Sequence, residues 1–183
     1  MMISVETREY PELTAALDSL LHYSRQLGAD ESLVLGGGGN TSIKARGSDV
    51  AGRPLDVLLV KGSGSELKSA QAHDFTPMRL ADLLMLRTRD RLSDEDMVDY
   101  LARCKLDPSA PRPSIETLLH AFIPAASVFH SHADAILMLT NSRENERVLR
   151  ELFGDTVITI PYERPGFGLS RAVADAVAAT PEA

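Results

Sequence analysis

The chain has 183 residues and a formal net charge of −7, with 44% hydrophobic and 25% charged residues. These values predict one compact, soluble domain with a sizeable core. The acidic balance argues against a nucleic-acid partner, because binding to a phosphate backbone depends on clustered Lys and Arg. A small anion is not excluded, since a helix N-terminus or one positive group can hold a phosphate.

We expect neither a membrane partner nor secretion. No apolar run reaches about 18 residues, and the segment from Met1 to Leu13 lacks the basic and apolar regions of a signal peptide. The single cysteine, Cys104, cannot form an intramolecular disulfide. These features predict a cytoplasmic protein in which Cys104 is a packed helix residue rather than a nucleophile.

The spacing of apolar residues predicts helices and strands that follow one another irregularly along the chain. Helices are expected at residues 10–28, 77–86, 93–104, 115–123, 134–142 and 144–154. Strands are expected at residues 32–35, 41–45, 55–61, 126–132 and 155–162. Thr76, Ser93 and Ser114 are expected to cap three of the helices. Without a strict strand–helix repeat, we expect an α/β sandwich with a mainly antiparallel or mixed sheet, in which strands 41–45 and 55–61 pair antiparallel.

Two glycine-rich loops are candidates for anion binding. The run from Gly36 to Gly39 is followed by Asn40, Thr41 and Ser42. Each glycine loses much backbone entropy on folding, so the run indicates positive φ angles or a close backbone approach. It forms either a flexible hairpin tip or an anion cradle in which backbone N–H groups and the three polar side chains donate.

The second loop, VKGSGSEL, offers Lys61, Ser63 and Ser65 as donors around two glycines. Its residue order matches neither a P-loop nor a dinucleotide-binding fingerprint. A nucleotide ligand is therefore not expected.

The segment FHSHADAI places His130 and His132 on one face of a predicted strand, with Asp134 two residues further on. The two imidazoles either bind one metal ion or are two half-buried histidines. Asp134 either fixes a histidine tautomer or caps the following helix.

A carboxylate also stands at a predicted helix start. Glu116 follows Ser114 in RPSIETLLH, where it either stabilises the helix dipole or acts as a general base. His22 and His120 lie on helices with apolar stripes, and we interpret both as structural. We assign no role to His73.

Taken in order and spacing, the segments GGGGNTSIK, VKGSGSEL, RPSIETLLHAF and FHSHADAI resemble the class II aldolase/adducin family. The resemblance runs from about Leu33 to Gly168 and is strongest to the aldolase half of bifunctional rhamnulose-1-phosphate aldolase/short-chain dehydrogenase proteins. It implies a three-layer α/β/α sandwich with a mainly antiparallel or mixed central sheet.

The resemblance also implies a reaction. The family cleaves a ketose 1-phosphate, of the rhamnulose or fuculose 1-phosphate type, into dihydroxyacetone phosphate and an aldehyde through a metal-stabilised enediolate. Non-catalytic adducin-like binding or scaffold domains and sugar-phosphate epimerases belong to the same family, and both remain alternatives. The implied partners are a small sugar phosphate and identical subunits, in a tetramer with sites at subunit interfaces.

Residue roles follow from the same resemblance. His130 and His132 match two ligands of a divalent metal, usually zinc, and Glu116 matches the glutamate that moves protons at the enediolate carbon. The positions that match the phosphate-binding loops are Asn40, Ser63, Gly64 and Ser114.

Two positions depart from the family pattern. Ile115 stands where the sugar-phosphate aldolases have a second serine, which leaves the substrate open. The family takes a third histidine ligand from a later strand, whereas no histidine follows His132 here. We therefore expect residues 1–183 to form a single class II aldolase-like domain that either lacks its C-terminal portion or has lost the metal site. In both cases, weak metal binding and low or no aldolase activity are expected of this chain alone.

Overall fold

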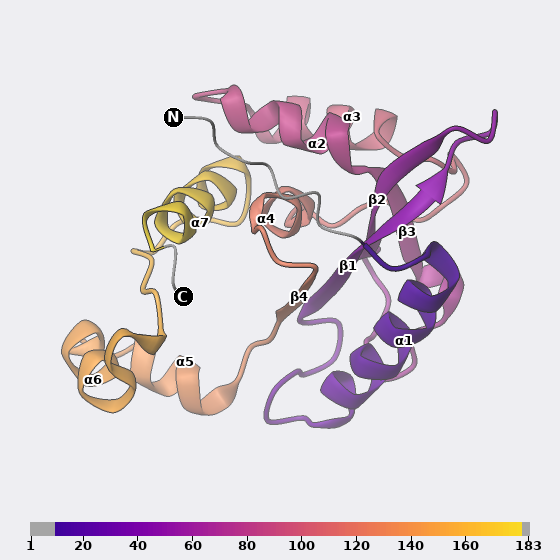
Figure 1. Cartoon of the computed structure of the whole chain (residues 1–183). Helices are drawn as coiled ribbons and strands as arrows, with labels where there is room; N and C mark the ends of the chain where they lie inside the picture. Colours follow the sequence, from indigo (N-terminus) through magenta and orange to yellow (C-terminus); the bar gives the residue numbers. More distant parts are fainter. Residues whose placement is uncertain (1–9, 181–183) are drawn as a thin grey trace.

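The computed structural model describes residues 10–180. Its centre is a four-stranded sheet with strand order β3-β2-β1-β4, in which every neighbouring pair is antiparallel (Figure 1). The strands are β1 (Asn40–Ser48), β2 (Pro54–Lys61), β3 (Phe75–Arg79) and β4 (Ser127–His130). β1 and β2 pair as the sequence predicts, with Ser42 opposite Val60.

Helices cover both faces of the sheet and give the expected three-layer α/β/α sandwich (Figure 1). The α-helices are α1 (Leu13–Ala29), α2 (Leu80–Met85), α3 (Asp94–Arg103), α4 (Thr117–Phe122), α5 (Asp134–Thr140), α6 (Asn145–Phe153) and α7 (Phe167–Ala179). Short 3-10 turns occupy Ala72–Asp74, Leu86–Thr88 and Gly154–Thr156. α1 lies alone on one face, while α2, α3, α4 and α7 gather on the other.

The alternation of side chains along β2 divides the core into two parts. Val57 and Leu59 pack against α1, where Leu20 is buried. Leu58 and Val60 point to the opposite face and pack with α4 and its neighbours. This pattern follows from the two-residue period of a strand, and it explains why β2 is an almost continuous apolar run.

β1 is different, because its side chains toward α4 are polar. Asn40, Ser42 and Lys44 are only 2%, 1% and 3% exposed. The Lys44 ammonium donates to the carbonyls of Ile123 and Ala125, at distances of 2.5 and 2.6 Å. These carbonyls lie at the C-terminal end of α4, where a positive charge is favourable. Polar contacts to β1 therefore fix the position of α4.

One predicted helix start is wrong. Thr76, expected to cap a helix, lies in β3 opposite Val60, and the next residue, Pro77, lies opposite Leu59. β3 is an edge strand, where a proline can be accommodated because its missing N–H faces away from the sheet. The helix α2 begins only at Leu80. Packing of Phe75 and Met78 in the two cores outweighs the local capping pattern.

Two predicted strands are also wrong. Residues 32–35 form a turn in which the N–H groups of Leu33 and Val34 both donate to Asp30. Residues 155–162 carry the apolar pattern of a strand, but Asp155 and Thr156 belong to a 3-10 turn, and residues 157–162 have no ladder partner among residues 10–180. Local propensity alone does not make a strand, because its backbone groups need a neighbour.

The prediction for α3 is confirmed. Ser93 is its N-cap, and its hydroxyl accepts a hydrogen bond of 3.1 Å from the N–H of Asp96. Ser114 likewise precedes α4, but residues 114–116 form a turn and the helix begins at Thr117.

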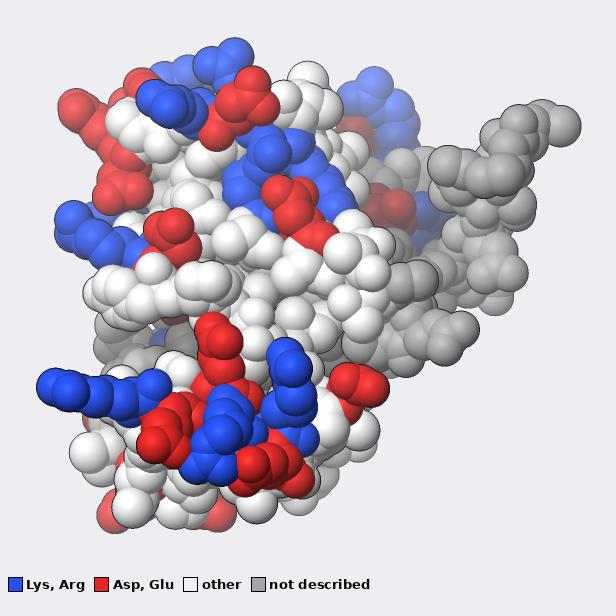
Figure 2. All heavy atoms as spheres, turned by 90° about the vertical axis from the view of Figure 1, so that its left-hand side faces the viewer, with Lys and Arg blue, Asp and Glu red and all other residues white. Residues whose placement is uncertain are grey.

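Charges of both signs are interspersed on the face shown in Figure 2. On α6, for example, Arg147 pairs with Glu144 and Glu151. The net negative charge is therefore not gathered into one patch on this face. Within residues 10–180, no helix combines the length and the hydropathy needed to cross a membrane.

Candidate active site

The predicted functional segments meet at one end of the sheet. β1 begins at Asn40, whose Cα partner in β4 is His130, and the neighbouring β2 ends at Lys61. The loop after β2 then contacts the segment before α4, because the N–H of Ser63 donates to the carbonyl of Arg112 at 2.9 Å. The antiparallel order thus brings both glycine loops, the start of α4 and the histidines together.

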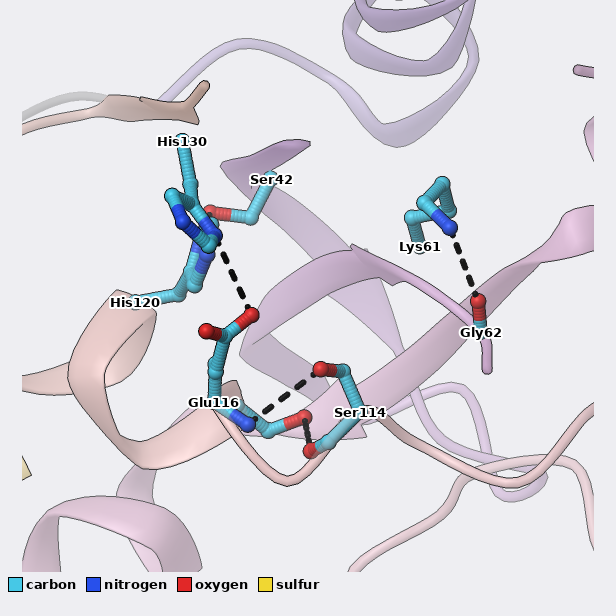
Figure 3. A network of polar contacts seen from close by, with 8 residues as sticks. Ser42, Lys61, Gly62, Ser114, Glu116, His120 and His130 are labelled. Atoms are coloured by element: carbon cyan, nitrogen blue, oxygen red, sulfur yellow. Dashed lines mark hydrogen bonds and ion pairs between the residues drawn. The ribbon is translucent and has the colours of Figure 1, made fainter. Parts of the chain in front are cut away.

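Glu116 and His130 form the central contact of this site. Figure 3 shows the Glu116 carboxylate pointing toward the His130 ring, and the distance from Oε2 to Nδ1 is 3.1 Å. Burial alone would raise the pKa of Glu116, but the hydrogen bond and charge of His130, with the nearby His120 and His132, hold it below its ordinary value. An ionised Glu116 accepts a hydrogen bond from the Nδ1–H of His130, which leaves Nε2 of that ring for a ligand.

The two histidine rings lie side by side although they are not on one strand. β4 ends at His130, so His132 falls outside it, yet the ring centroids are 4.8 Å apart. The N–H of His132 donates to the carbonyl of Leu33 at 2.9 Å, which holds the exposed segment after β4 against the turn before the glycine run.

That contact explains part of the glycine run. A Cβ at Gly38 would stand 3.2 Å from Nδ1 of His132, and one at Gly39 would stand 2.9 Å from the carbonyl of His130. Gly39 also has φ +72, which other residues adopt rarely. The glycines allow the loop to approach the histidines closely.

The polar residues after the glycines face different ways. Thr41 shares a hydrogen bond of 2.7 Å with Ser24 of α1, and Ser42 shares one of 2.8 Å with Nδ1 of His120. Both hydroxyls are therefore engaged inside the protein, and the prediction that they donate to an anion is wrong. Asn40 is different, because its Oδ1 is buried and has no protein partner within the described residues. A buried amide oxygen without a partner is costly unless a ligand or water satisfies it.

The remaining loop residues shape the site. Ser63 and Gly64 are exposed, and Gly64 has φ +95. The hydroxyl of Ser114 accepts a hydrogen bond of 3.2 Å from the N–H of Glu116 and so fixes the turn before α4.

The chain can now be compared with known proteins. Residues 18–183 match the model of the protein family described as "Class II Aldolase and Adducin N-terminal domain". The chain belongs to this family. It is 42% identical over 172 residues to "Uncharacterized oxidoreductase YuxG" of Bacillus subtilis (strain 168). The aligned region covers 94% of this chain and 25% of that protein. The chain thus spans a quarter of the length of this curated relative.

Solved structures agree with the family assignment. The N-terminal class II aldolase domain of a conserved protein from Thermoplasma acidophilum is 42% identical, with a TM-score of 0.84 over 96% of this chain and 80% of that one. The l-fuculose-1-phosphate aldolase from Thermus Thermophilus has 14% identity and a TM-score of 0.53, over 90% of this chain and 72% of that one. The second likeness shows the fold alone.

Within the family fold, two other residues need a new interpretation. Lys61 is buried and donates to the carbonyl of Ser65 at 2.6 Å, so it organises its own loop. Burial lowers its pKa, and the charges of Asp74 and Glu116 oppose this effect. Ile115, at a position where we expected an effect on substrate binding, lines a hollow next to Leu101 of α3.

The side chains fit a divalent metal in part. Two imidazoles lie next to each other, and the carboxylate on His130 is the usual partner of a metal-binding histidine. That partner is Glu116. Asp134, for which the sequence left open a tautomer-fixing or a capping role, is exposed and is the first residue of α5, whose N-cap is Ala133. Residues 10–180 form no cluster of three or more His, Cys, Asp or Glu side chains suited to a metal ion. Among the described residues, His130 and His132 are the two adjacent imidazoles that could be candidates for metal ligands.

One residue of the site was missed from the sequence. His120 is 0% exposed, and its Nε2 has no hydrogen-bond partner among residues 10–180. The available signal was its spacing, since residues four apart share a helix face, which places His120 beside Glu116.

Proposed function

We propose that this chain is a metal-dependent aldolase domain that cleaves a ketose 1-phosphate, of the rhamnulose or fuculose 1-phosphate type, into dihydroxyacetone phosphate and an aldehyde. The contact of 3.1 Å between Glu116 and His130, with the ring of His132 beside it, is the observation that supports this proposal most. It joins a carboxylate that can move protons to a pair of imidazoles that can bind a cation.

Each residue has a distinct task in this proposal. His130 and His132 would hold a divalent cation, which when bound acts as a Lewis acid on the carbonyl and hydroxyl oxygens of the substrate. Glu116 takes and returns the proton at the reacting carbon. It is ionised at neutral pH, and because its pKa is lowered it is a weak base that relies on the Lewis acid to acidify the substrate. Its hydrogen bond to His130 also orients that imidazole.

The phosphate would bind between the two loops. Asn40, Ser63 and Ser114 supply polar side chains there, and Gly64 gives the second loop a conformation that exposes its backbone. Asn40 would donate to the phosphate through its Nδ2, whereas its unpartnered Oδ1 is an acceptor and needs a donor from elsewhere.

Zinc titration by calorimetry, combined with a retro-aldol assay on rhamnulose and fuculose 1-phosphates, tests the proposal. Zinc should bind weakly to this chain, because two histidines make an incomplete ligand set. His130→Ala should abolish binding, whereas His73→Ala should leave it unchanged, since His73 is an exposed residue outside the site. Cleavage of either substrate by the longest natural form should depend on the metal.

A second function is favoured by one observation. The described residues lack a three-ligand metal cluster, as would suit a non-catalytic adducin-like binding domain. Absence of zinc from the longest natural form, together with absence of turnover, would support this alternative and contradict the aldolase proposal.

A further inference from the structure

A buried hydrogen bond joins β1 to α4 directly behind Glu116. The ring of His120 lies against Ser42, with 2.8 Å between Nδ1 and the hydroxyl oxygen (Figure 3). His120 is fully buried and Ser42 is 1% exposed. The other ring nitrogen, Nε2, is also buried and has no partner among residues 10–180. A buried polar atom without a partner requires an explanation.

The surroundings of the ring indicate which nitrogen carries the proton. If Nδ1 donated to Ser42, the hydroxyl hydrogen of Ser42 would have no acceptor among its described side-chain contacts, and the ring would keep a buried lone pair at Nε2 near the negative charge of Glu116. If Ser42 donates to Nδ1, the proton resides on Nε2 and the negative field stabilises it. The second arrangement gives the Ser42 hydroxyl an acceptor, and it leaves on Nε2 a buried N–H that a nearby negative charge favours.

Glu116 is the source of that field. The N–H of His120 donates to the carbonyl of Glu116 at 3.2 Å, so the two residues are one turn apart and their side chains share a face. The negative charge of the Glu116 carboxylate favours the protonated form of His120, and it opposes the effect of burial on the pKa of that ring. One of its oxygens, Oε2, contacts His130, and a carboxylate can accept further hydrogen bonds.

We propose that Ser42 and His120 form a positioning pair, in which Ser42 fixes the proton on Nε2 of His120, and this N–H, which has no hydrogen-bond partner among residues 10–180, attracts the carboxylate of Glu116 and keeps it between two imidazoles. The inference rests on the proposed role of Glu116 in proton transfer. His120 touches no reacting atom, since its Nε2 is shielded from solvent. It acts through Glu116, by limiting the positions that the carboxylate can take.

The first test needs no substrate and no metal. Long-range ¹H–¹⁵N correlation spectra of the wild-type chain at pH 7 should show His120 as a neutral ring protonated at Nε2. The signals are assigned by their loss in His120→Gln. A ring protonated at Nδ1 would overturn the proposal, because no proton would then face Glu116.

The second test compares two substitutions of the same residue. Gln places an amide N–H near the position of Nε2, whereas Leu fills the space without a donor. Crystal structures should show Glu116 within hydrogen-bond distance of His130 in His120→Gln and displaced in His120→Leu. The same carboxylate position in both variants would contradict the proposal.

Kinetics provide the third test. His120→Leu should lower kcat by about 10- to 100-fold with little change in KM, as is typical when the support of a reactive group is lost. His120→Gln should recover most of the rate, and Ser42→Ala should lie between the two. Equal losses in Leu and Gln would mean that His120 only fills space.

Ser24→Ala is the matched control, because it removes a hydroxyl from the other buried hydrogen bond of β1, on the α1 face. Its kcat should equal that of the wild type, and a loss equal to that of Ser42→Ala would overturn the proposal. These rates are measured on the longest natural form, and if its wild type turns over no ketose phosphate, the proposed function fails. The tautomer and the position of Glu116 then decide the positioning role by themselves.

Discussion

The two faces of β1 carry adjacent residues that are equally buried but serve different purposes. Toward α1, Thr41 bonds to Ser24 and is followed on the same face by the apolar Ile43. Toward α4, Ser42 bonds to His120 and is followed by Lys44, which binds the end of that helix. The α1 face needs only to stay packed, while the α4 face holds a carboxylate in place. Burial alone therefore does not distinguish a structural polar residue from a functional one.

The largest expected effect lies on the α4 face. Glu116→Gln keeps the size of the side chain but removes the base, so kcat should fall by about 10²- to 10⁴-fold. The thermal midpoint should change little, because Glu116 is partly exposed. Assays of turnover and thermal unfolding on the same sample measure both. Wild-type turnover in this variant would remove Glu116 from the mechanism.

The α1 face should show the opposite behaviour. Leu20 is 1% exposed in the core beneath α1, so Leu20→Ala should lower the free energy of unfolding by about 2–5 kcal/mol. The rate per folded molecule should remain unchanged, because this core does not include α4. Urea titration gives the first quantity and active-site normalised kinetics the second.

A decrease in pH should lower the stability of the protein through His120, which lies on the α4 face of β1. Burial lowers the pKa of His120 to about 4, from an ordinary value of 6.5, so the unfolded chain binds more protons between these pH values. The free energy of unfolding should therefore fall as the pH decreases from about 6.5 to about 4, by up to about 3 kcal/mol.

The lowered pKa of Glu116 adds a loss in the same direction at lower pH. The difference between wild type and His120→Gln in urea titrations across this range isolates the histidine contribution. A pH-independent difference would show that His120 is charged in the folded state or not buried.

The smallest expected effect on stability comes from a substitution of Thr41, and it distinguishes this residue from its neighbour Ser42. Thr41→Val removes one buried hydrogen bond to Ser24, whose hydroxyl keeps the carbonyl of Leu20 as a partner. We expect a loss of about 0.5–1.5 kcal/mol in unfolding free energy and no change in kcat. Ser42→Ala should reduce kcat instead. The same change in kcat in both variants would contradict the proposal that the two faces of β1 differ in function.

Sequence patterns were sufficient to predict the secondary structure where contacts between residues close in sequence determine it. Ser93 caps α3 through a contact three residues away, and the paired strands β1 and β2 are neighbours in sequence. They failed where a distant partner decides, as in β3, whose residues resemble a helix start but pair with β2. Residues 157–162 failed for the converse reason, since they find no partner within the described chain.

The site shows the same division. The spacing of His130 and His132 and the place of Glu116 at a helix start left their roles open, and only the family resemblance suggested them. The contact between Glu116 and His130 could not be predicted, because it depends on the order of strands in the sheet. Ser42 was misassigned because the sequence does not say toward which face it points. His120 was overlooked because it is embedded in an apolar stripe.

The short length of α4 limits how this site could be re-engineered. α4 has only six residues, far fewer than the roughly 12–15 that an isolated helix needs to persist in water. Contacts with β1 hold it in place, because Ser42 contacts His120 within the helix and Lys44 donates to the carbonyl of Ile123 after its last residue. A graft of residues 114–120 into another scaffold would therefore have to carry residues 40–44 with it as a single discontinuous cassette.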